Sequence, residues 1–201
     1  TTEIYTLSLH DALPICHTAM LGRNINGYKK KDVAYCKFHI AEQVLFGQQI
    51  GWINADIVDD PRKFPFLRKM VQLRWQYRKL FNSGRLLRPP VVEADLPDQA
   101  SFAGMGRPPA WQVFAMPPVR AGLWQDESGT CILFVVNTAD QEASCKVTVN
   151  LPDSLLPAST ADIRLVHCET AGADTQPALE QQPNGLKVQV GLAPEGMLVL
   201  E

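Results

Sequence analysis

The chain has 201 residues, with 19 Lys and Arg against 21 Asp and Glu, which gives a formal net charge of −2. A nearly neutral chain does not match a protein dedicated to nucleic acid, because that class concentrates positive charge against phosphates. Hydrophobic residues make up 46 % of the composition, which is typical of a globular protein. No apolar run approaches the ~20 residues that cross a bilayer, so we expect no membrane partner.

The start of the chain resembles the translation of a short-read sequencing adapter, with a match at each of the first fifteen positions. The last adapter base would open the next codon, so Cys16 would be hybrid, and we expect residues 1–16 to be foreign to the native fold. Without Glu3 and Asp11 the remaining chain has equal numbers of acidic and basic residues. A native start is then not visible, a signal peptide cannot be judged and the localisation stays open. We expect no metal or nucleophilic site from four neighbouring residues: His10, Asp11, Cys16 and His17.

Four further cysteines are present: Cys36, Cys131, Cys145 and Cys168. None belongs to a C-x-x-C pair, and three fall within apolar, strand-like runs. This pattern favours buried free thiols, since free cysteine behaves as a small hydrophobic residue. Cys131 and Cys145 flank one predicted hairpin and could instead form a disulfide, which leaves the redox compartment open.

A helix is predicted over residues 32–46, with Asp32 as N-cap and Gly47 as its C-terminal stop. Residues 49–54 then read as a short buried strand, followed by an acidic loop. A second helix is predicted over residues 65–82, because Pro65 suits a first turn. The order helix, strand, helix is typical of a parallel α/β fold. The two apolar stripes comprise Val33, Cys36, Ile40, Ala41, Val44 and Leu45 in the first helix, and Phe66, Leu67, Met70, Val71, Leu73, Tyr77, Leu80 and Phe81 in the second.

Residues 85–109 are predicted to be an irregular connector, because five prolines and two glycines interrupt them. From residue 110 the apolar period becomes two, and residues 144–151 alternate most clearly. One face of such strands is buried and the other is wet, as in an antiparallel sandwich. The predicted strands cover residues 111–116, 119–124, 131–137, 144–151, 163–167, 185–192 and 196–201.

Two segments resemble the C-terminal end of bacterial TIM-barrel glycoside hydrolases: LFGQQIGW at 45–52 and RWQYRKLFNSGRLLRPP at 74–90. They most resemble an uncharacterised family in which the final barrel strand ends in Gly-Trp. A last helix of this type follows there, and a C-terminal β-sandwich closes the chain. The resemblance extends from residue 17 to residue 201.

This resemblance implies an α+β fragment: the last βα units of a (β/α)8 barrel, followed by a C-terminal antiparallel β-sandwich. The two helices would be the seventh and eighth of the barrel, and residues 49–54 its eighth strand. The expected division is a barrel end at 17–90, a linker at 91–109 and a sandwich at 110–201. The truncated barrel would leave both helical stripes exposed and prone to aggregation, although the sandwich could fold alone.

The resemblance also implies a parent enzyme that cleaves glycosidic bonds with two carboxyl groups at barrel strand ends. Most of those strand ends would be missing, so we expect this fragment to be inactive. A carbohydrate substrate is the expected partner of the parent, no cofactor or metal is implied, and the oligomeric state is open. The alternative is a non-catalytic carbohydrate-binding or adhesion sandwich, which predicts a row of exposed aromatic side chains. The strand aromatics Trp111, Phe114, Trp124 and Phe134 are scattered, which disfavours it.

Candidate sugar-binding residues follow the presumed last barrel strand. Trp52 could stack on a sugar ring or be a core aromatic. Asn54 and Asp56 lie on the same loop, where Asp56 could bind hydroxyls, help in acid–base work, or be a solvated loop acid or helix cap. Asn24, with Arg23 and Asn26 beside it, could recognise hydroxyls or belong to a glycine-flanked turn. Asp59 and Asp60 are interpreted as caps before the second helix.

Residues 61–90 hold nine basic residues and no acids. Nucleic-acid binding is one interpretation, since Trp75 and Tyr77 lie nearby. The basic outer face of a barrel helix is the favoured one, because the apolar stripe needs a partner that a barrel wall supplies. His167 and Cys168 end a strand without a second metal-binding pair. The basic residues are Arg62, Lys63, Arg68, Lys69, Arg74, Arg78, Lys79, Arg85 and Arg88.

Overall fold

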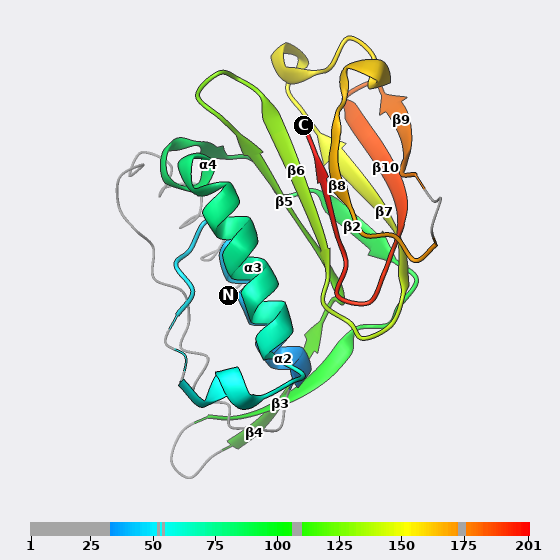
Figure 1. Ribbon diagram of the computed structural model, residues 1–201. Coiled ribbons are helices and arrows are strands. Elements are labelled where there is room, and N and C mark those ends of the chain that lie inside the picture. Colours follow the sequence, from blue (N-terminus) through cyan, green and yellow to red (C-terminus); the bar gives the residue numbers. More distant parts are fainter. Residues whose placement is uncertain (1–32, 52, 54, 106–109, 173–175) are drawn as a thin grey trace.

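The computed structural model describes residues 33–51, 53, 55–105, 110–172 and 176–201, and over 100–114 only the backbone. Two antiparallel sheets pack face to face, and helices cover the outer face of one of them (Figure 1). A two-stranded hairpin extends from one end of the molecule. The described chain is therefore a mixed α and β structure dominated by antiparallel strands.

The larger sheet has five strands and the smaller sheet has four. In spatial order the larger contains β1 (Arg85–Leu86), β5 (Val119–Gln125), β6 (Cys131–Asn137), β11 (Met197–Leu200) and β8 (Leu165–Cys168). The smaller contains β2 (Val91–Ala94), β7 (Ala143–Asn150), β10 (Gly185–Leu192) and β9 (Ala178–Gln182). The hairpin pairs β3 (Gln99–Met105) with β4 (Ala110–Met116). Every strand pair in the described residues is antiparallel, which confirms the predicted antiparallel sheets.

The core between the two sheets is built from alternating strand positions. Val147 of β7 lies opposite Val188 of β10, and both are fully buried. Their neighbours Lys146 and Gln189 are exposed on the outer face. The period-two pattern therefore predicted the wet and dry faces of the four-stranded sheet correctly.

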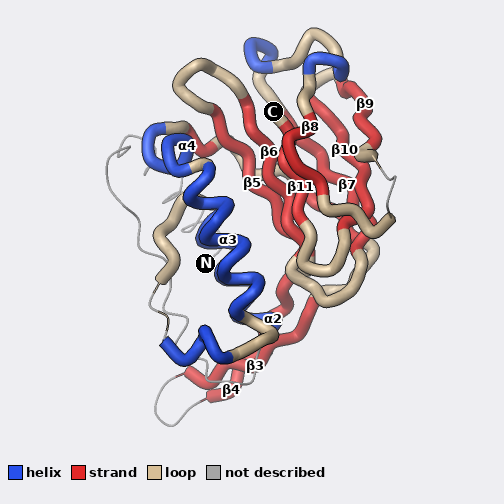
Figure 2. Tube along the Cα trace, in the orientation of Figure 1, coloured by secondary structure: helices blue, strands red, loops and turns tan. Residues whose placement is uncertain are grey.

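The five-stranded sheet is buried on both faces, which corrects the expectation of one wet face per strand. In β6, Leu133 and Val135 point into the sandwich, while Phe134 and Val136 pack under the helices. Described helices supply this second cover (Figure 2). A strand covered on both sides reads as a continuous apolar run, as residues 131–137 do.

The first described helix, α2 (Val33–Leu45), ends one residue before the predicted end at residue 46. Gly47 follows in the left-handed region with φ of 69° and donates its N–H to the carbonyl of Val44. The indole Nε1 of Trp124 donates to the carbonyl of Leu45 at 2.8 Å, so β5 satisfies an orphan acceptor of the helix end. Asp32, the expected N-cap, lies outside the described residues.

Helix α2 is buried almost all round, not along one stripe. Besides its apolar residues, Lys37, His39 and Gln43 are also buried. The side-chain oxygen of Gln43 accepts a hydrogen bond from the N–H of Gly51 at 2.8 Å, so this buried acceptor is satisfied.

The second predicted helix is two helices, α3 (Phe64–Gln76) and α4 (Arg78–Ser83). Tyr77 interrupts it, with φ of −99° and ψ of 23°, and no glycine or proline marks this break in the sequence. Pro65 lies in the first turn, as predicted. Val71 is 47 % exposed and does not belong to the buried stripe, so that assignment was wrong.

The partner of both helical stripes is the sandwich. Phe66, Met70 and Leu45 form one core cluster with Phe134 and Val199 of the five-stranded sheet. In this structure a sheet of the sandwich, and not a barrel wall, covers the stripes. The expected exposure of both stripes is therefore corrected.

Two regions differ from the predicted secondary structure. Among the described residues of 49–54, only Gln49 forms a β-bridge, and that bridge is isolated. The predicted strand and the parallel α/β pattern built on it are therefore not observed. A 3₁₀ helix, η1 (Ala55–Asp59), follows. The predicted irregular connector instead contains β1, β2 and β3, with Pro89, Pro90 and Pro97 between the strands. Strand β9 was also missed, and two 3₁₀ turns precede β8: η2 (Asp153–Leu155) and η3 (Thr160–Asp162).

Candidate functional site

The predicted sugar-binding residues are only partly covered by the structure. Asp56 lies in η1, is exposed, and forms no hydrogen bond or ion pair with a described residue. Trp52, Asn54 and Asn24 lie outside the described residues, as do Arg23 and Asn26. The described residues therefore do not test whether these side chains lie together, and the sugar-binding set remains a prediction.

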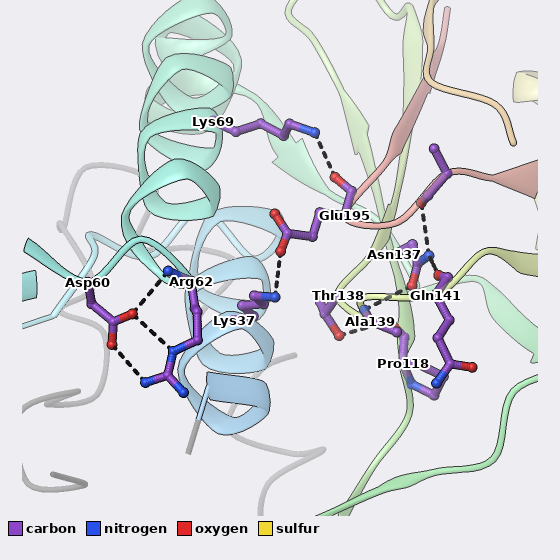
Figure 3. Close-up of polar contacts among 11 residues, drawn as sticks. Lys37, Asp60, Arg62, Lys69, Pro118, Asn137, Thr138, Ala139, Gln141 and Glu195 are labelled. Atoms are coloured by element: carbon purple, nitrogen blue, oxygen red, sulfur yellow. Dashed lines mark hydrogen bonds and ion pairs between the residues drawn. The ribbon is translucent and has the colours of Figure 1, made fainter. Parts of the chain in front are cut away.

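Asp60 organises the turn that leads into α3. Its carboxylate accepts the backbone N–H of Arg62 at 3.0 Å and pairs with the Lys63 ammonium at 3.1 Å (Figure 3 shows the contacts with Arg62). The Arg62 N–H is the main cause that lowers the pKa of Asp60 to about 2, and the two cations lower it further. The N-cap of α3 is Lys63 without a side-chain cap bond, so Asp60 stabilises the preceding turn instead of capping the helix itself.

A polar junction joins both helices to the loop between β10 and β11. The ammonium of Lys37, whose side chain is 3 % exposed, pairs with the Glu195 carboxylate at 2.5 Å. Lys69 of α3 donates to the backbone carbonyl of Glu195 at 2.7 Å (Figure 3) and to the Glu169 carboxylate at 2.8 Å. These contacts tie the helical layer to the sandwich at its loop end.

Glu195 holds an uncommon backbone conformation for its residue type, with φ of 54°. It is the third residue of a turn that starts at Ala193 and has Pro194 second, and Gly196 donates to the carbonyl of Ala193 at 2.9 Å. Glycine or asparagine is the usual choice at such a position. A glutamate at this position costs backbone strain. The ion pair between its carboxylate and the Lys37 ammonium gives a physical reason for a glutamate there.

A cleft of about 500 Å³ lies between α3 and the β8 edge of the five-stranded sheet. Its floor is apolar and its rim is polar. The floor and ends comprise Phe64, Pro65, Leu73, Val166, Met197 and Val199. The rim comprises Arg68, Lys69, Gln72, Gln76, Tyr77, His167 and Glu169.

Some polar groups of the rim form hydrogen bonds or ion pairs within the protein, and others bond to no described residue. Glu169 accepts Lys69 and also the backbone N–H of Met197 at 3.0 Å, and His167 lies 3.6 Å from it. The helix-side groups Arg68, Gln72 and Gln76 stand at successive four-residue intervals, and no described residue bonds to their side chains. Hydrogen-bonding capacity thus lines one wall of the cleft. No local sequence pattern indicates this cleft, because its second wall comes from residues about a hundred positions further along the chain.

The basic run on α3 and α4 is largely engaged in intramolecular contacts. The Arg74 guanidinium lies 5.8 Å from the Phe81 ring centre and that of Arg78 4.9 Å from Trp75. Burial lowers the pKa of Arg74, and its Nη1 is buried without a hydrogen-bond partner. These contacts account for part of the basic run without a ligand, and the absence of a nucleic-acid partner remains a prediction.

The four described cysteines are all free, so the alternative of a Cys131–Cys145 disulfide is not observed. Burial raises the pKa of Cys145 to about 11, and the nearby Asp95 carboxylate adds to the effect. Burial also raises the pKa of Cys131 and of Cys168. The thiols of Cys131, Cys145 and Cys168 therefore lack the lowered pKa of a nucleophile.

The described residues provide neither a metal-binding group nor a membrane-spanning helix. No group of three or more His, Cys, Asp or Glu side chains among them could hold a metal ion. No helix in the described part of the chain is long and apolar enough to cross a membrane.

Comparison with known proteins gives one weak sequence relationship. No protein-family model matches the chain. Over 108 residues it is 27 % identical to a protein of Bacteroides thetaiotaomicron named "Putative glycoside hydrolase", and the match covers 52 % of this chain and 15 % of that protein. The chain therefore spans a small part of the relative it matches.

A solved structure, an alpha-amylase from H. orenii, aligns with 85 % of this chain and 36 % of its own. The TM-score is 0.35 and the sequence identity 9 %, so this likeness carries no argument. The sequence similarity to a protein named as a glycoside hydrolase is the finding that bears on function.

Proposed function

We propose that this chain is the C-terminal part of a carbohydrate-active enzyme that hydrolyses glycosidic bonds, and that it is inactive by itself. In this proposal residues 17–90 are the end of a (β/α)8 barrel, and residues 110–201 supply most strands of a β-sandwich whose two sheets are completed by β1 and β2. The observation that carries the proposal is the 27 % identity to a protein named as a glycoside hydrolase. The resemblance of the segments at 45–52 and 74–90 to the end of TIM-barrel glycoside hydrolases agrees with it.

The packing supports a buttressing role for the sandwich. The helices and the five-stranded sheet share one apolar cluster, and an ion pair with the buried Lys37 ammonium fixes the loop at Glu195. Such a shared core would hold the last barrel helices at a fixed angle to the sandwich. Catalysis needs groups positioned within a fraction of an ångström, so rigid support at the barrel end is chemically useful.

The carboxyl groups of the described residues support the inactivity of this part. A glycosidase acid needs a raised pKa and a second carboxyl across the bond. The two described carboxyls with clearly displaced pKa values, Asp60 and Asp126, are both lowered by hydrogen bonds. We propose that Asp56, Asn54 and Asn24 contact sugar hydroxyls and do not complete a catalytic pair. Trp52 would stack on the sugar ring.

The alternative, a non-catalytic binding sandwich, gains no support from the described aromatics. Trp124 and Phe134 are buried beneath the helices and are not available to a ligand.

The test compares two proteins on a panel of nitrophenyl glycosides: the 201-residue chain, and the longer product encoded by the source DNA. We expect the chain to be inert and the longer product to hydrolyse at least one substrate. In the longer product, Asp56→Asn should lower kcat/KM roughly tenfold through lost hydroxyl contacts, whereas Asp59→Asn, an exposed neighbour, should not. A longer product that is inert on the whole panel, or an active 201-residue chain, would contradict the proposal.

A further inference from the structure

We propose that the cleft between α3 and the β8 edge is a saccharide-binding site, separate from the residues already considered as sugar contacts. Its volume of about 500 Å³ lies within the ~300–1,000 Å³ range of small-molecule sites. The choice of a saccharide rests on the proposed function, while the site itself rests on the geometry of the cleft.

The floor of the cleft matches the apolar face of a sugar ring. Leu73 from α3 and Val166 and Val199 from the sheet form that floor, and Tyr77 closes one end. The Tyr77 ring is held edge-on against Phe134, with ring centres 4.9 Å apart, so its position is fixed before a ligand arrives. Aromatic and aliphatic surfaces pack against the C–H groups of a pyranose ring, whose hydroxyls point outward.

The rim matches those outward hydroxyls. Gln72 and Gln76 each offer a carbonyl acceptor and an amide donor, the combination that reads a pair of neighbouring hydroxyls. Both stand one helical turn apart on the same wall, with Arg68 one turn further. None of the three is bonded to a described residue, so binding would not have to break an internal hydrogen bond.

The charge of the rim favours an uncharged or weakly acidic ligand. Lys69 and Glu169 neutralise each other at 2.8 Å, which leaves Arg68 as the rim cation without a described partner. Strongly anionic ligands need several converging cations, which this rim does not offer. A mono- or disaccharide, neutral or with one carboxylate, fits both the size and the charge.

The test is a titration of the isotopically labelled 201-residue chain with maltose, cellobiose and digalacturonate, followed by NMR chemical shifts. We expect one of the three to shift signals of Gln72, Gln76 and Tyr77 with millimolar affinity. Gln72→Ala and Gln76→Ala should each weaken that affinity about fivefold, the effect of one lost hydrogen bond. Gln189→Ala, an exposed glutamine on the other sheet, is the matched control and should leave it unchanged.

The result that would overturn this proposal is an absence of shifts at the cleft with all three saccharides, or binding that Gln189→Ala weakens as much as Gln72→Ala. Hydrolysis by the longer product, measured separately, keeps the two proposals distinguishable. Hydrolysis without binding at the cleft overturns the cleft alone, and binding without hydrolysis overturns only the proposed function.

Discussion

Replacing Glu195 with glutamine should weaken the attachment of the helices to the sandwich. Gln keeps an oxygen near Lys37 but removes the charge that compensates a buried ammonium, whose side chain is 3 % exposed. Removing one partner of a fully buried pair costs ~3–5 kcal/mol. Glu195 is 27 % exposed, so solvent reaches the pair, and we expect a loss of about 2 kcal/mol in the free energy of unfolding.

The same reasoning predicts a small effect for Lys37→Met. This change removes the buried charge itself and keeps an apolar stem of similar length, so the loss should stay below about 1 kcal/mol. The double variant should resemble Lys37→Met, because no charge is left unpaired. Glu180→Gln is the control, since Glu180 and its partner Lys187 are exposed and 3.7 Å apart, and it should cost less than about 0.5 kcal/mol.

Urea unfolding followed by circular dichroism measures these differences. A loss of 2 kcal/mol corresponds to a fall in Tm of roughly 4–8 °C for a chain of this size. The reasoning is refuted if Glu195→Gln is as stable as the parent chain, or if Lys37→Met loses as much stability as Glu195→Gln does.

Three further outcomes follow from the structure. Gly47→Ala should cost about 2 kcal/mol, because φ is 69° and the new Cβ would lie 2.6 Å from the Trp124 ring; unaltered thermal unfolding would contradict this. Cys145, whose pKa is raised to about 11, should resist a thiol reagent at neutral pH until the chain unfolds, so rapid labelling of the native chain would show that its burial is wrong. Because the pKa of Asp60 is lowered from 3.8 to about 2, its charged form stabilises the fold above pH 3.8, and this contribution is lost as pH falls through about 2. Asp60→Asn should therefore lose up to about 1 kcal/mol at neutral pH and much less near pH 2, and a pH-independent loss in urea titrations would count against the pairing with Arg62 and Lys63.

The sandwich was largely predictable because alternation is a local signal. Residues 185–192 and 131–137 coincide with β10 and β6 as observed. The second covered face of β6 was overlooked, although its unbroken apolar run is the signal of a strand buried on both sides. Strands β2 and β3 were missed because the surrounding prolines were taken to exclude regular structure, whereas proline here lies between strands.

The candidate sites were much less predictable, because their walls come from distant parts of the chain. Lys69 and Glu169 are 100 residues apart in sequence, and Lys69 and Glu195 are 126 apart. The apolar stripe of α3 indicated that the helix packs against another element, but it did not indicate which element. Only the fold pairs that stripe with Phe134 and leaves Gln72 over a cleft.

The most direct test of the proposed function is to sequence the source DNA upstream of codon 17. The account predicts a reading frame that continues through alternating strands and helices of a barrel, with carboxylates at strand ends. A start codon just upstream of His17 would contradict it, because the helices could not then be the end of a barrel.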